Sequence, residues 1–69
     1  MSVLAAWEAS NQVSAYIREV EHLKYAVRQN FEDMDLENNY RRDEMEDRVI
    51  AVEAECDSII GILNSLNFE

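Results

Sequence analysis

The sequence contains no proline and a single glycine, Gly61. These two residue types interrupt helices and form tight turns, so their scarcity removes the usual boundaries between short strands. Alanine, glutamate, arginine, leucine and methionine, which favour helices, are abundant instead. The sequence therefore predicts an all-α protein.

Cysteine is nearly absent, because Cys56 is the only one in the chain. One cysteine cannot form an internal disulfide or supply a zinc cluster, and this favours a reducing, cytoplasmic setting. Cys56 falls on the apolar face of a predicted helix. It is interpreted as a small apolar core residue, with a symmetric disulfide between two copies as the alternative.

Long hydrophobic runs are also missing. No apolar stretch approaches the roughly 18 residues that a membrane-spanning helix needs. The apolar start of the chain, residues 1–8, has no basic residues before it, so a secretory signal peptide is not expected. We therefore expect no membrane association.

Basic residues are few: six lysines and arginines stand against fifteen acids, and the net charge is −9. This charge repels nucleic-acid phosphates and anionic lipids, so direct binding to either is not expected, whereas a basic protein surface would fit. Eight of the acids gather in the middle of the chain as an acidic tip, which is either a solvated face or a binding surface for a basic partner. They are Glu32, Asp33, Asp35, Glu37, Asp43, Glu44, Glu46 and Asp47.

The apolar residues recur at intervals of three and four, which is typical of helices that pack through a heptad repeat, abcdefg. In the first half, position a holds Val3, Ser10, Ile17, Lys24 and Phe31, and position d holds Ala6, Val13, Val20, Val27 and Met34. In the second half, a holds Val49, Cys56 and Leu63, and d holds Met45, Val52, Ile59 and Leu66. Lys24 at a either fixes the pairing of the helices or buries its methylenes and extends its ammonium to solvent.

The two repeats are out of phase, since Met34 and Met45 are eleven residues apart. Asn38 and Asn39 lie between them, and adjacent asparagines favour a turn. We therefore predict one domain, residues 1–69, folded as an antiparallel two-helix hairpin with helices at about 3–36 and 44–67 and a turn at about 37–43. The alternative is one long coiled-coil helix with a stutter near Asn38.

Capping residues and cross-helix pairs follow from this hairpin. Ser2 is a candidate N-cap of the first helix. Asp43 is a candidate N-cap of the second helix, and Glu46, three residues later, would complete a capping box. The a-to-d pairs of the hairpin have residue numbers that add to 83: Met34 with Val49, Phe31 with Val52, Val27 with Cys56, Val20 with Leu63, and Ile17 with Leu66.

Five large apolar residues lie beside the heptad core at e and g, in the half of the hairpin away from the turn. They are Trp7, Tyr16, Leu23, Ile60 and Ile62. A two-helix chain of 69 residues buries too little apolar surface to be stable alone. We therefore expect these residues to form a partner interface, completed into a bundle by self-association or by an amphipathic helix of another protein.

No constellation of residues indicates catalysis. Glu19 and His22 have the spacing of a di-iron ligand pair, but they fall at the outward positions c and f. The acids Glu53, Glu55 and Asp57 lack the glycine-containing loop of a calcium site. We expect no enzyme activity, no cofactor and no metal.

Three classes of function remain. The first is a small helical adaptor or assembly chaperone; in size, acidity and two-helix plan the hairpin resembles the small chaperones that keep type III secretion needle subunits soluble, and the likeness includes the apolar stretch 59–63, Ile-Ile-Gly-Ile-Leu. The second is a structural coiled-coil subunit that self-associates into a bundle. The third is an acidic inhibitor that mimics nucleic acid, as some phage proteins do.

Overall fold

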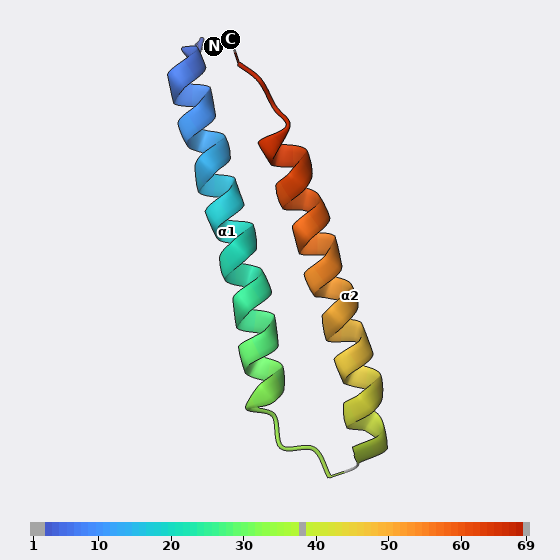
Figure 1. Cartoon of the computed structure of the whole chain (residues 1–69). Helices are drawn as coiled ribbons and strands as arrows, with labels where there is room; N and C mark the ends of the chain where they lie inside the picture. Colours follow the sequence, from blue (N-terminus) through green and yellow to red (C-terminus); the bar gives the residue numbers. More distant parts are fainter. Residues whose placement is uncertain (1–2, 38, 69) are drawn as a thin grey trace.

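The chain folds into two antiparallel helices. The structure, a computed structural model, describes residues 3–37 and 39–68, together with all their side chains except those of Asn39 and Tyr40. Helix α1 covers Ala6–Glu32 and helix α2 covers Asn39–Asn64. Both ends of the chain lie at one end of the hairpin and the connecting loop lies at the other (Figure 1). The prediction of an all-α helical hairpin is confirmed, and the single continuous helix is wrong.

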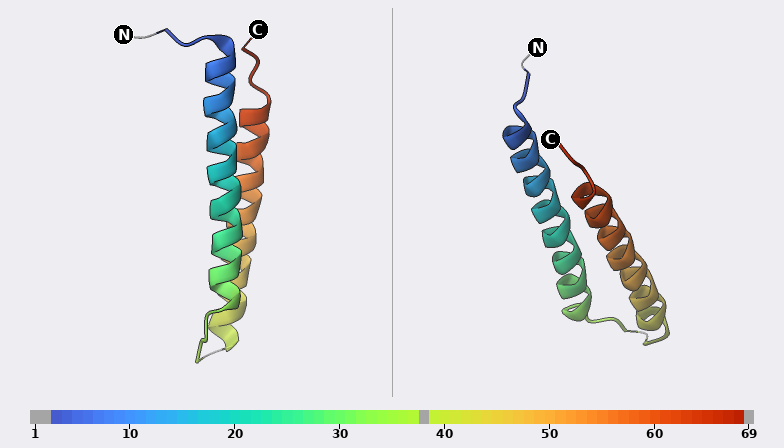
Figure 2. Two further views of the ribbon diagram at one scale, coloured as in Figure 1. Left: turned by 90° about the vertical axis from the view of Figure 1, so that its left-hand side faces the viewer. Right: turned by 45° about the horizontal axis from the view of Figure 1, so that its top comes forward.

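The hairpin is a rod (Figure 2), with extents of 53 × 18 × 17 Å. Its Cα radius of gyration is 16.7 Å, whereas a globular domain of this length would have about 11 Å. Each helix therefore packs against one neighbour only, and most of its circumference faces outward.

The connection between the helices comes earlier than predicted. Helix α1 ends at Glu32, and α2 begins at Asn39, inside the stretch 37–43 predicted as the turn. Acidic residues are unfavourable at the negative end of a helix dipole, and the run of acids that starts at Glu32 and Asp33 ends α1 early. The prediction that Asp43 and Glu46 cap α2 is wrong, since both lie inside the helix.

The start of α1 also differs in detail from the expectation. Ala5 occupies the N-cap position, and the Glu8 carboxylate accepts a 3.4 Å hydrogen bond from the Ala5 backbone N–H. This bond satisfies an amide that a helix start otherwise leaves without a partner. The proposed cap Ser2 lies outside the described residues.

Few side chains are fully buried. Among residues 3–37 and 39–68, the buried apolar side chains are Phe31, Val49 and Cys56, each no more than 5% exposed. All three lie in the half of the hairpin nearer the loop. Cys56 is a free thiol between the helices, in agreement with its interpretation as a core residue.

The helices align as the heptads predict. In a hairpin whose a-to-d pairs add to 83, the e residues of the two helices lie opposite one another. An e residue follows its a residue by four positions, and the opposite e residue comes six positions before the d residue that pairs with that a, so the e-to-e pairs add to 81. Arg28 and Glu53 are such a pair, and they are in contact. This contact is the one that the predicted register requires.

Helix α2 is nevertheless rolled about its axis relative to the predicted core. Position e lies about 40° to one side of a, and d about 60° to the other. The buried Val49 and Cys56 occupy a, and the partly buried Glu53 occupies e, whereas Val52 and Ile59 at d are 39% and 43% exposed. The face of α2 that packs on α1 is thus a and e, and the d residues lie at its edge.

Candidate functional site

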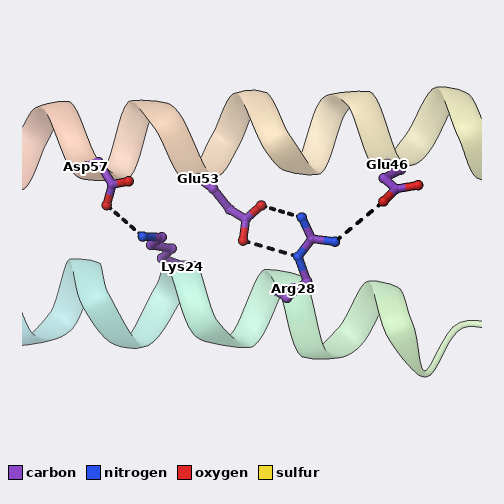
Figure 3. Close-up of polar contacts among 5 residues, drawn as sticks. All are labelled: Lys24, Arg28, Glu46, Glu53 and Asp57. Atoms are coloured by element: carbon purple, nitrogen blue, oxygen red, sulfur yellow. Dashed lines mark hydrogen bonds and ion pairs between the residues drawn. The ribbon is translucent and has the colours of Figure 1, made fainter.

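One flank of the hairpin is crossed by ion pairs that join α1 to α2 (Figure 3). The Arg28 guanidinium donates two hydrogen bonds to the Glu53 carboxylate, of 3.2 Å from Nε and 2.5 Å from Nη2, and approaches Glu46 at 4.0 Å. Beside it, Lys24 Nζ donates a 2.7 Å hydrogen bond to Asp57. We call this side, with Glu21, Lys24, Arg28, Glu53 and Asp57, the polar flank.

These contacts favour the charged forms of the paired groups. The hydrogen bond from Arg28 holds the pKa of Glu53 below its ordinary value, and the hydrogen bond to Asp57 raises the pKa of Lys24. The Lys24 side chain is 35% exposed, so its ammonium lies at the edge of the helix interface, in agreement with the second interpretation of its a position. Its partner there is Asp57 on α2.

An open groove of about 640 Å³ runs along the polar flank. Its apolar lining includes Ile17, Tyr25 and Ile60, and its charged lining includes the two ion pairs described above. Because the cations of the groove are already paired with its carboxylates, they are not available for an anionic ligand.

The opposite flank is apolar. In an antiparallel pair, g positions face g positions on the side away from the e positions, and the roll of α2 turns its d residues toward this side. Five large side chains lie there with 39% to 66% of their surface exposed. They are Tyr16, Leu23, Val52, Ile59 and Ile62, and we call them the apolar flank. Leu66 lies beyond the end of α2, where it lines a pocket with Trp7 and Ser10.

The five residues predicted as a partner interface are thereby divided. Tyr16, Leu23 and Ile62, all at g, belong to the apolar flank. Ile60, at e, lines the groove on the polar flank and is partly buried. Trp7 is 66% exposed, at the open end of the hairpin beside the C-terminal residues 66–68.

Two members of the apolar flank are not predicted. The heptad pattern assigns Val52 and Ile59 to the core as d residues, but they are 39% and 43% exposed. Leu66, the next d residue, lies outside α2 and is 51% exposed. The missed signal is the difference between e and g. Position e carries Glu21, Arg28, Glu46 and Glu53, whereas g carries no charge in α1 and carries Arg48 and Glu55 in α2.

The acidic tip comes together at the loop end of the hairpin. Glu32 ends α1, Asp33, Asp35 and Glu37 lie in the loop, and the other four acids lie in the second and third turns of α2. Within the described part of the chain, Glu46 approaches Arg28 and Glu44 lies 3.7 Å from Arg41.

Arg42 holds the loop against the end of α1. Its Nη1 donates a 2.9 Å hydrogen bond to the Met34 carbonyl, and its guanidinium lies 4.7 Å from the centre of the Phe31 ring. The bond satisfies a carbonyl just beyond the end of α1, and the ring attracts the cation. No sequence pattern distinguishes Arg42 apart from its charge.

The described residues hold neither a metal-binding cluster nor a membrane-spanning helix. In those residues no three His, Cys, Asp or Glu side chains are grouped so that they could hold a metal ion. Neither described helix combines the length and the apolar character that crossing a bilayer requires.

Comparisons with protein-family models, with curated proteins and with solved structures find no match to this chain. The candidate site is therefore defined by the chain's own residues, and its most prominent feature is the apolar flank.

Proposed function

We propose that the chain is a non-enzymatic protein-binding module that packs amphipathic helices against its apolar flank. Such a module acts as a small adaptor or assembly chaperone, and it does so in the cytoplasm, where Cys56 remains a thiol. The single observation that carries this proposal is the exposure of five large apolar side chains on one side of a rod that buries only three among its described residues.

Helix packing is the recognition mode that fits the shape of this surface. The apolar flank lies along two parallel ridges, one on each helix, and its residues recur at the three- and four-residue steps that a facing helix can fill. Contiguous exposed apolar surface of this kind marks interaction sites on proteins whose remaining surface is polar. The polar flank, whose Lys24 and Arg28 are paired with carboxylates of α2, remains in water.

Site-specific photocrosslinking in the cells that make the chain tests this proposal. A photoreactive amino acid replaces Leu23 or Ile59 on the apolar flank. In matched controls it replaces Tyr25 or Ile50, which are 69% and 51% exposed and lie at b positions on the polar side. We expect covalent adducts with one defined polypeptide from the two flank positions and not from the controls. Equal adducts from all four positions, or none from the flank, would contradict the proposal.

A further inference from the structure

We infer that the apolar flank is covered by the apolar flank of a second copy, so that two hairpins form an antiparallel four-helix bundle. This inference rests on the proposed function and names its partner. It requires that the uncovered surface be large enough for a stable dimer, that its charge suit an identical surface, and that one orientation of the copies be favoured.

The exposed area meets the first requirement. The chain exposes 5705 Å², whereas a compact folded monomer of 8.1 kDa exposes about 4,500 Å². The excess, about 1,200 Å², is greater than the roughly 800 Å² that each partner contributes to a standard protein interface. Pairing of two hairpins would thus bring each one to an ordinary surface area for its mass.

The charge distribution favours a second copy over a basic partner. The acidic tip segment, residues 32–47, has eight acids and two bases, a net charge of −6. The body of the hairpin, residues 3–31 and 48–68, has six acids and four bases, a net charge of −2. A basic partner would be drawn to the tip. The apolar flank lies on the nearly neutral body and suits an equally neutral, apolar surface, which the chain itself provides.

The same distribution favours one orientation. Copies aligned in parallel would place two segments of charge −6 side by side. Antiparallel copies place them at opposite ends of the bundle, separated by far more than the screening length of about 8 Å at physiological salt. Electrostatic repulsion between the copies is therefore smallest in the antiparallel dimer.

The flank has a centre about which two copies can be related. Leu23 of α1 and Ile59 of α2 lie at the same level, with Tyr16 one heptad toward the termini and Val52 one heptad toward the loop. A two-fold axis at the level of Leu23 and Ile59 brings the larger Tyr16 of one copy over the smaller Val52 of the other. This arrangement continues the alternation of large and small side chains that close packing needs.

Sedimentation equilibrium over a range of concentrations tests the dimer. The wild-type chain should approach twice 8.1 kDa. The variant with Leu23→Asp and Ile59→Asp should dissociate at least about 100-fold more readily, because two unpaired carboxylates would be buried. The control with Tyr25→Asp and Ile50→Asp adds the same charges to the same helices on the polar side and should dimerise like the wild type. A wild-type chain that stays monomeric, or equal weakening by both pairs of substitutions, would overturn the inference.

A distance between copies tests the orientation. A spin label is attached at Glu37→Cys in a Cys56→Ala background. The end of α1 at Glu32 is nine residues from Leu23, which is about 14 Å at 1.5 Å per residue, and Glu37 lies beyond it in the loop. Labels in antiparallel copies should therefore be at least about 27 Å apart. A separation below about 20 Å would indicate parallel copies and contradict the inference.

The self-association and the proposed function can fail separately. A monomeric chain whose Leu23 and Ile59 positions still crosslink to a different polypeptide would overturn the dimer and leave the protein-binding function standing. Absence of any adduct specific to the flank would overturn the function itself.

Discussion

Arg28 of α1 and Glu53 of α2 form a two-bonded ion pair across the hairpin, although they are 25 positions apart in the sequence. The planar guanidinium matches the carboxylate in this geometry, so the pair fixes both the alignment of the helices and the side of α2 that faces α1. Rolling α2 toward Arg28 brings its e positions into the interface. It also turns Val52 and Ile59 outward, onto the apolar flank.

The pair predicts a specific pH dependence of stability. Because Arg28 lowers the pKa of Glu53 from its ordinary value of 4.5, its contribution is fully present above the unfolded-state pKa and is lost as the pH falls through the lower pKa of the folded state. Glu53→Gln should therefore lower the thermal midpoint at pH 7, and its difference from the wild type should shrink as the pH falls below about 4.5.

Circular dichroism melts between pH 7 and pH 3, at one protein concentration, measure this difference. Glu19→Gln removes the same charge from an exposed outward position of α1 and serves as the control. A difference between Glu53→Gln and the wild type that stays constant down to pH 3 would contradict the stabilising role of the ion pair.

Arg42 should contribute more to the free energy of unfolding than its neighbour Arg41. Arg42→Ala removes both the hydrogen bond to the Met34 carbonyl and the contact with the Phe31 ring. We expect a loss of about 1–2 kcal/mol in the free energy of unfolding. Arg41→Ala removes the same charge from a side chain that is 73% exposed and should cost less than about 0.5 kcal/mol. Urea denaturation of the two variants compares them, and equal losses would show that the loop does not depend on these contacts.

Gly61 offers a stabilising substitution. A Cβ added to it would meet no atom within 4 Å, and its φ is not positive. Gly61→Ala should raise the free energy of unfolding by about 0.5–1 kcal/mol, because alanine loses less backbone freedom in a helix. Ala54→Gly, one heptad earlier at the same outward position, should lower it by a similar amount. Chemical denaturation at a fixed concentration measures both, and a destabilising Gly61→Ala would reveal a neighbour at this position that the hairpin alone does not have.

The hairpin could be predicted because the phase of the heptads is broken between Met34 and Met45. The position of the turn was predicted less accurately than the hairpin fold. Asn38 and Asn39 drew the expected turn toward residue 43, whereas the acids from Glu32 onward end α1 and the helical propensity of the following residues starts α2 at Asn39. Arg42 then secures the shortened loop, through a carbonyl that sequence patterns do not reveal.

The apolar flank could be predicted only in part. Tyr16, Leu23 and Ile62 were recognised as surplus apolar residues, but Trp7 and Ile60 were grouped with them because e and g positions were treated alike. An antiparallel hairpin separates these two positions onto opposite sides. Leu66 also falls at d, but it lies beyond the end of α2. Val52 and Ile59 fall at predicted core positions because a heptad pattern does not specify the roll of a helix about its axis. That roll follows from contacts between distant residues, such as the Arg28 and Glu53 pair.

The central claim, that the apolar flank is the surface covered in the associated protein, is tested most directly by two tyrosines of the unmodified chain. Tyr16 lies on the apolar flank and is 49% exposed, and Tyr25 lies on the polar side and is 69% exposed. Hydroxyl-radical oxidation of each tyrosine, read by peptide mass spectrometry, is compared at protein concentrations from below to above the association range. We predict that the oxidation rate of Tyr16 falls severalfold as concentration rises while that of Tyr25 stays constant. Constant oxidation of Tyr16, or equal protection of both tyrosines, would contradict the claim.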